Sequence, residues 1–249
     1  MNTSASNIMA IAKRELVGYF ASPVAYVFLV IYLLLAGFFT FTVRPAFFDY
    51  GQASLITLFR WPPWLFLLLV PAGGMRLWSE ERRLGTIELL FTMPGTSLQA
   101  IVGKFVASWF FLVLALVLTF PVVITVNYLG DPDNGVIFAS YVGCALLAGA
   151  YLAISCMTSA LTRNQVVSFI LAVVICLFLI LAGFPPVTEI LAGWFPPAVV
   201  QAVASVSVIT HFDGFQKGLL DSRDLLFFLS LIGFTLFTTG VILRGHRAG

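Results

Sequence analysis

The sequence predicts an all-α polytopic membrane protein with six membrane-spanning helices. Of its 249 residues, 60% are apolar and only 10% are charged, and the mean hydropathy is +1.03. So few charges cannot cover the surface of a soluble domain, whose apolar share is nearer one half. A spanning helix needs about 20 mainly apolar residues. Six segments meet this requirement: 23–43, 57–78, 98–127, 137–161, 166–184 and 224–243.

Residues 1–22 are predicted to form a helix that lies on the membrane surface. Apolar side chains recur along this stretch among three charged ones, Lys13, Arg14 and Glu15. This pattern is typical of an interfacial amphipathic helix, and a frayed polar tail is the alternative. The apolar run that follows is too long for a signal peptide and has no small-residue cleavage site after it, so we expect it to be retained.

Residues 79–95, between the second and third spans, are predicted to form a short charged helix outside the membrane. A charge at the centre of a bilayer costs about 2.5–3.5 kcal/mol, so these side chains must face water or a partner. Leu84, Ile87 and Phe91 follow the spacing of one helix face. The segment is therefore well placed to contact a partner, and a solvated interfacial helix is the alternative. Its charges are Glu80, Glu81, Arg82, Arg83 and Glu88.

The next three spans are separated by polar breaks. The span 98–127 is longer than a bilayer requires, so we expect it to tilt or to project into water. Asp131-Pro132-Asp133-Asn134-Gly135 has the composition of a tight turn. The three cysteines lie in apolar stretches without the spacing of a metal or redox pair, so they are predicted to be small core residues. They are Cys144, Cys156 and Cys176.

Residues 185–223 are apolar but broken by Pro and Gly, and they include the adjacent aromatic residues Trp194 and Phe195. The segment is too broken for one span and too apolar for a free loop. We expect an extracytoplasmic re-entrant hairpin of two short helices, packed on protein so that its backbone is not exposed to lipid. An amphipathic surface hairpin is the alternative.

Six spans place both termini on the same side of the membrane, and the basic residues indicate which side. Nine of the thirteen Lys and Arg residues fall on the side of the termini, and four fall on the other. By the positive-inside rule the termini are cytoplasmic. The nine are Lys13, Arg14, Arg76, Arg82, Arg83, Lys104, Arg163, Arg244 and Arg247, and the four are Arg44, Arg60, Lys217 and Arg223.

The sequence contains no catalytic motif that we can identify. The two histidines, His211 and His246, have no metal-ligand partner at helical spacing, and the stretch around Gly103-Lys104 departs from the spacing of a phosphate-binding loop. The spans 137–161 and 166–184 hold no charged residue, which argues against a transporter driven by an ion gradient. We therefore expect a non-catalytic chain without a cofactor of its own and without a nucleic-acid partner.

Two motifs carry a resemblance to a known family. The coupling segment of ABC-2-type transporter permease subunits resembles one stretch of this chain, Glu81…Gly85-Thr86-Ile87-Glu88-Leu89-Leu90…Pro94. The similarity extends over residues 1–249, read as a single transmembrane domain. More narrowly, the gliding-motility-associated (Gld-type) permeases resemble the stretch His211-Phe212-Asp213-Gly214-Phe215-Gln216-Lys217-Gly218 followed by Asp221-Ser222-Arg223-Asp224.

The resemblance implies a type V ABC exporter-like fold in the bacterial cytoplasmic (inner) membrane. Two permease copies, identical or different, would pair along the second and fifth spans. A separate ABC ATPase would hold ATP and magnesium and dock on a coupling helix over 79–95, with Glu81 and Glu88 facing it. Its coupling residues would be Glu80, Glu81, Arg82, Arg83, Gly85, Thr86, Glu88 and Pro94, next to the interfacial residues Lys13, Arg14 and Glu15.

The family does not fix the cargo. A lipid-like or amphipathic substrate would be exported, or motion would pass to an extracytoplasmic partner such as a membrane-anchored subunit. A structural membrane anchor and a membrane-embedded lipid enzyme are the alternatives. The residues expected to form the outer partner site or the path are Trp194, Phe195, His211, Asp213, Lys217, Asp221 and Arg223.

Overall fold

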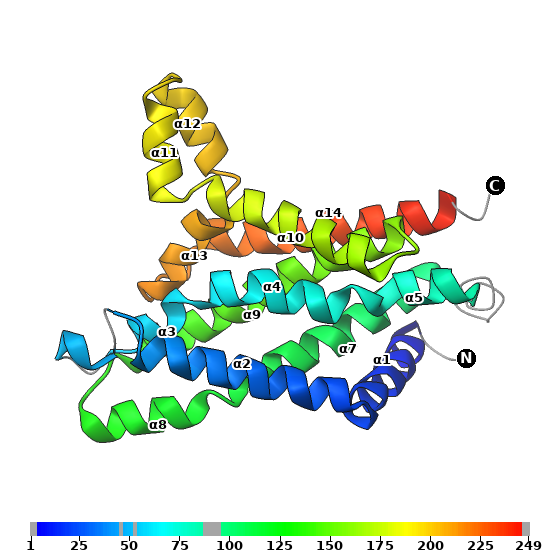
Figure 1. The fold of residues 1–249 in the computed structure, drawn as a ribbon, viewed down its shortest axis with the longest axis horizontal. Helices are drawn as coiled ribbons and strands as arrows, with labels where there is room; N and C mark the ends of the chain where they lie inside the picture. The colour runs from blue at the N-terminus through cyan, green and yellow to red at the C-terminus, as the bar shows by residue number, and fades with distance from the viewer. Residues whose placement is uncertain (1–3, 45–46, 52–53, 87–95, 246–249) are drawn as a thin grey trace.

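A computed structural model of the chain describes residues 4–44, 47–51, 54–86 and 96–245, and these residues form helices joined by short connections. The long helices run side by side along one axis, and α1, α5 and the last turns of α14 lie at the same end of the bundle (Figure 1). The helices are α1 (Ser4–Ala21), α2 (Pro23–Phe41), the 3-10 turn η1 (Phe47–Tyr50), α3 (Ile56–Arg60), α4 (Pro62–Gly74), α5 (Arg76–Leu84), α7 (Ser97–Val117), α8 (Phe120–Leu129), α9 (Asn134–Leu161), α10 (Gln165–Leu181), α11 (Pro185–Ala192), α12 (Pro197–Ala204), α13 (Val208–Gln216) and α14 (Ser222–Gly245).

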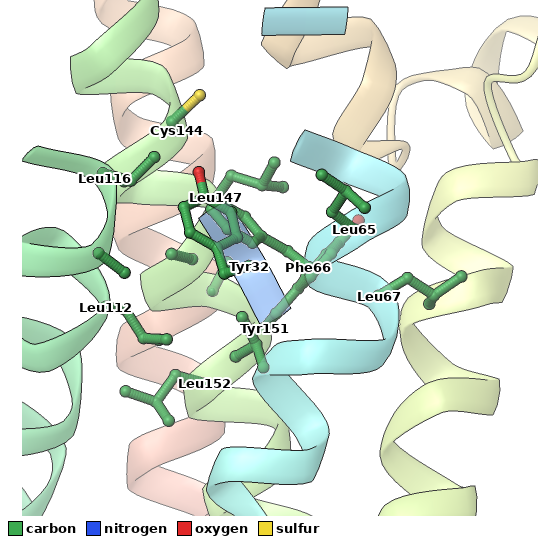
Figure 2. Close-up of a cluster of buried hydrophobic side chains, with 14 of the residues drawn as sticks. Tyr32, Leu65, Phe66, Leu67, Leu112, Leu116, Cys144, Leu147, Tyr151 and Leu152 are labelled. Carbon is green, nitrogen blue, oxygen red and sulfur yellow. The ribbon is translucent and has the colours of Figure 1, made fainter. Parts of the chain in front are cut away.

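Helix α9 forms the centre of the bundle. It is apolar on all sides, as expected for a fully buried helix, and it packs against α4, α5, α7, α10, α13 and α14. In the core, Tyr32 of α2 stacks on Phe66 of α4 with 5.6 Å between ring centroids, and both rings lie beside Leu147 and Tyr151 of α9 (Figure 2). Cys144, Cys156 and Cys176 are buried with free thiols, so the prediction that they are core residues is confirmed.

Polar side chains begin several helices at the predicted breaks. Asp133 Oδ1 accepts hydrogen bonds from the backbone N–H groups of Gly135 (2.8 Å) and Val136 (3.3 Å) at the start of α9. Thr96 and Gln99 form a reciprocal capping box at the start of α7. These caps satisfy N–H groups that have no partner within the helix, so the chain can reverse direction at these points.

By length and composition, four helical segments in the described part of the chain could cross a membrane: α2, the α7–α8 segment of 32 residues, α9 and α14. The number rises to six if two bent pairs each count as one span, α10 with α11 at 65° and α12 with α13 at 69°. These findings support a multi-pass membrane protein. The particular six-span layout stays a prediction.

The second predicted span, 57–78, is divided over three helices. Trp61 separates α3 from α4, and the 13-residue α4 begins with Pro62 and Pro63. Proline lacks a backbone donor and starts helices but does not continue them. The apolar run is therefore long enough to span, although no single helix within it is.

Helix α4 is an internal helix of the subunit. It packs against α2, α9 and α10, and its buried side chains include Leu65, Phe66 and Val70. Leu68 is the large apolar side chain that α4 exposes. Most of the surface of α4 is thus covered within its own subunit, and the expectation that the second span lines a seam between subunits stays a prediction. Helix α10, from the fifth predicted span, does expose an apolar face.

Helix α1 packs against the start of α7 rather than lying free. A side chain at Gly103 would collide with Ile11, which lies 2.8 Å from the position of a Cβ atom. The Tyr19 and Ser108 hydroxyls are hydrogen bonded at 2.8 Å, and Tyr19 stacks on Phe111 with 5.4 Å between centroids. Because the glycine allows this close approach, α1 is an ordered part of the bundle and not a frayed tail.

Helices α11 and α12 form a hairpin that projects from the side of the bundle (Figure 1). They pack against each other, and neither helix has a buried residue. The hairpin is attached to α10 at its base, where the Ser207 hydroxyl donates to the Leu179 carbonyl at 2.9 Å. The two short helices were expected, but the cover by protein is absent within the described subunit. Helices of eight residues satisfy only part of their own backbone, so the end groups of α11 and α12 need caps, water or a partner.

Candidate functional site

Helix α5 carries the charged segment away from the end of the bundle. It ends at Gly85, whose φ of 71° is a left-handed conformation that side chains disfavour. The backbone N–H of Thr86 then donates to the Glu81 carbonyl at 3.0 Å, which closes the helix. The chain therefore turns at the Gly-Thr pair. Glu88 and Pro94 of the predicted coupling segment lie outside the described residues.

Lys104 of α7 is the buried centre of this end of the bundle. Its side chain is 5% exposed, and its Nζ donates to Glu81 Oε1 at 2.6 Å and to the Leu77 carbonyl at 3.1 Å. Glu15 Oε1 lies 4.0 Å away, and the ammonium group sits 5.0 Å from the centroid of the Trp78 ring. A buried cation is stable only with such partners. We call Lys104, Glu81, Glu15 and Trp78 the Lys104 cluster.

The Lys104 cluster joins four helices. Glu15 comes from α1, Glu81 and Trp78 from α5, and Lys104 from α7. The fully buried Trp78 reaches α9, where its Nε1–H donates to Cys156 Sγ at 3.1 Å. Since these contacts join α5 to both α7 and α9, α5 cannot shift alone without breaking buried interactions.

Arg82 forms a second attachment between α5 and α9. Its guanidinium donates to the Ala160 carbonyl, near the C-terminus of α9. That carbonyl has no partner within its own helix, and the negative end of the helix dipole favours a cation there. Burial lowers the pKa of Arg82 from its ordinary value, and the nearby Arg163 acts in the same direction. Arg82 is therefore bound inside the subunit.

The charges of α5 divide between an inner and an outer face. Glu81 and Arg82 bind within the subunit, and the Glu81 side chain keeps 25% of its surface exposed, so its contact with a partner stays a prediction. Arg83 and Thr86 are exposed, and Glu80 is half-buried. A partner at this end of the bundle would therefore meet only part of the predicted coupling set.

The interfacial charges Lys13, Arg14 and Glu15 lie on α1 next to this cluster. Arg14 and Glu15 form a 3.1 Å ion pair, and Lys13 is exposed. Sequence reasoning counted Lys104 for topology and tested it as part of a phosphate-binding loop, but missed its role as a buried centre. A lone charge within a predicted span, as Lys104 is within 98–127, was the available signal.

The predicted outer residues divide between the hairpin and the region where α13 meets α14. Trp194 (84% exposed) and Phe195 lie between α11 and α12, away from the other five. His211 Nδ1 lies 2.7 Å from Asp224 Oδ1, its Nε2 lies 3.0 Å from the Ser205 carbonyl, and the ring stacks on Phe227 with 4.0 Å between centroids. The remaining predicted residues are exposed: Asp213, Lys217, Asp221 and Arg223.

The His211–Asp224 pair joins α13 to α14 and to the end of the hairpin. Asp224 was absent from the predicted site residues, although it belongs to the motif that His211 begins. In the ranges that the structure describes, no three His, Cys, Asp or Glu side chains lie close enough together to hold a metal ion. The observed role of the pair is to hold α13, α14 and the end of the hairpin together.

Comparison with known proteins gives one match. Residues 66–239, from α4 to α14, match the family described as ABC-2 family transporter protein. The matched range covers more than half of the chain and includes α5, Lys104 and the hairpin. No curated protein gives a significant match. The match concerns the broad family, and the Gld-type subfamily stays a prediction.

Proposed function

The chain belongs to the ABC-2 transporter family, and we propose that it is the membrane permease subunit of a transporter driven by a separate ATPase chain. The observation that carries this proposal is the Lys104 cluster. It fixes the inner face of α5 to the bundle and leaves the outer face available. A helix that is attached to the bundle on one face and accessible on the other can be displaced by a bound partner and can move the helices attached to it.

The mechanism we propose is movement of α5 as one body with α1, α7 and α9. An ATPase that closes on ATP would press on the exposed face of α5 and on the turn after Gly85. The ion pair of Glu81 with Lys104 and the Trp78–Cys156 hydrogen bond would carry that displacement into α7 and α9. Packed side chains and hydrogen-bond networks between rigid elements are one physical route by which coupling travels between distant sites.

We propose that the end of the bundle with α1 and α5 faces the cytoplasm of a bacterial inner membrane. The basis is the excess of Lys and Arg predicted on that side. Pairing of two permease copies is part of the proposal, and the exposed apolar face of α10 favours it. That face includes Val166, Ile170, Val174 and Phe178.

For the cargo we propose a lipid-like or amphipathic molecule. The described helices expose mainly apolar faces. An ion or sugar that entered such surroundings without polar partners would lose hydration worth about 4–8 kcal/mol per polar group. A second candidate is the transmission of motion to an extracytoplasmic partner. The projecting hairpin favours it, because Trp194 is exposed at the turn between α11 and α12.

The test is ATPase stimulation in a reconstituted complex. The chain is co-purified with a candidate ABC ATPase subunit, and hydrolysis is measured with and without the permease in lipid vesicles. We expect a stable complex, stimulated hydrolysis, and loss of stimulation in Glu88→Ala. A complex that forms without any stimulation would favour a structural anchor. Nucleotide binding by the isolated permease would contradict the proposal.

A further inference from the structure

A cavity of about 590 Å³ lies beside the Lys104 cluster, between α1, α2, α4, α5 and α7. Its size falls in the range of about 300–1,000 Å³ that is usual for small-molecule sites. One part of its lining is charged and comes from α1, α5 and α7. The other part is apolar and includes Val27 and Phe28 of α2 and Leu69 of α4. The cavity is therefore amphipathic.

The charges that line the cavity are not all satisfied by the protein. Arg76 and Glu80 lie one helical turn apart on α5, yet neither forms an ion pair within the part of the chain that the structure describes. Such an opposite pair at i and i+4 would normally interact. In addition, Glu81 Oε2 is buried and has no hydrogen-bond partner. Lys104, by contrast, is already engaged by Glu81 and by the Leu77 carbonyl.

The lining groups that have no partner indicate which charges a ligand of this cavity would carry. Among the described residues that line the cavity, the groups without a partner are one cation, Arg76, and two acceptors, Glu80 and Glu81 Oε2. A head group with only a negative charge would leave the Glu80 carboxylate and the Glu81 Oε2 atom without a partner. A quaternary ammonium has no N–H to donate to Glu81. A primary ammonium next to a phosphate supplies donors and a negative charge together.

We propose that this cavity binds one phospholipid with a zwitterionic, primary-ammonium head group, that is, phosphatidylethanolamine. Its phosphate pairs with Arg76, its ammonium donates to Glu80 and Glu81, and an acyl chain lies along the apolar wall of α2 and α4. The bound lipid bridges the α1–α2 corner and α5. The inference needs only a membrane around the chain and does not depend on an ATPase partner.

The test uses the isolated chain in nanodiscs of equal parts phosphatidylethanolamine, phosphatidylcholine and phosphatidylglycerol. After transfer to detergent, native mass spectrometry counts the lipids that remain bound. We expect one phosphatidylethanolamine per chain, retained about tenfold more than either other lipid, as follows from one or two charge-assisted hydrogen bonds. Equal retention of the three lipids would overturn the proposal.

Variants then locate the lipid. Arg76→Gln and Glu80→Gln should each reduce retention by about tenfold. Val27→Trp, which fills the apolar end without changing a charge, should also reduce it. Arg60→Gln and Glu189→Gln are the matched controls, because both residues are exposed and neither lines the cavity.

Folding is checked for every variant by monodispersity in gel filtration. If a charge variant does not fold, lipid retention by Val27→Trp is the result that tests the proposal. Unchanged retention in the folded charge variants, or in Val27→Trp, would overturn the proposal. Loss of lipid in the controls as well would also overturn it. Because no ATPase is present, a failure here is distinguishable from a failure of the proposed permease function.

Discussion

Helix α5 and the α11–α12 hairpin both project from an end or side of the bundle, but they are attached in opposite ways. The inner face of α5 contains Trp78 with no exposed surface and an ion pair to a buried lysine. The hairpin has no buried residue in either helix. The comparison separates two kinds of exposed segment: α5 is joined to several helices by buried contacts, whereas the hairpin is held to the bundle at its base.

The largest expected difference between the two regions concerns their tryptophans. Trp78→Ala should lower the free energy of unfolding by about 3–5 kcal/mol, because it removes a fully buried side chain. Trp194→Ala should change it by less than about 0.5 kcal/mol, as for other surface positions. Thermal unfolding in detergent measures both. Equal losses of unfolding free energy in the two variants would contradict the distinction between an attached and a free region.

The next effect concerns the ion pair of the Lys104 cluster. Glu81→Ala should cost about 2–3 kcal/mol, at or below the low end for a buried pair because the Glu81 side chain is 25% exposed. The exposed Arg83→Ala on the same helix is the matched control and should be nearly neutral.

A double variant sharpens this result. Glu81→Ala combined with Lys104→Met should cost less than the sum of the two single changes, since no charge is then left buried without its partner. Additive losses in thermal unfolding would show that the two side chains do not stabilise each other.

A smaller effect separates the base of the hairpin from its tip. Gly183→Ala would place a Cβ atom 2.5 Å from the hydroxyl oxygens of Ser207 and Thr210, and should cost about 1–2 kcal/mol through overpacking. At Gly193 the nearest atom is 3.4 Å away, so Gly193→Ala should be tolerated. Limited proteolysis reports on the hairpin in both variants. Faster cleavage in Gly193→Ala than in Gly183→Ala would contradict this view of the hairpin.

Hydropathy predicted the helical membrane fold, the core cysteines and the breaks before α7, α9 and α10. It did not predict that 57–78 is divided, because a hydropathy average does not register the missing backbone donors of Pro62 and Pro63. The two short helices of the hairpin followed from their Pro and Gly residues. Their lack of cover did not, since cover depends on where other helices lie.

The candidate site was less predictable than the fold. Periodicity placed Glu81 on a charged helix but could not say which face turned inward. The partner of Glu81 is Lys104, which is 23 residues away and on another helix. Only the packing of α1, α5 and α7 brings these groups together, so the pairing follows from tertiary structure and not from a local pattern.

The most direct measurement for the central claim is ATPase stimulation by Lys104→Met in the reconstituted complex. If the Lys104 cluster carries the displacement of α5 into the bundle, this variant should still bind the ATPase but lose stimulation by about tenfold or more, which corresponds to at least about 1.4 kcal/mol of coupling. Trp194→Ala should retain full stimulation of hydrolysis by the lipid-embedded complex. Full stimulation by a folded, ATPase-bound Lys104→Met variant would contradict the account.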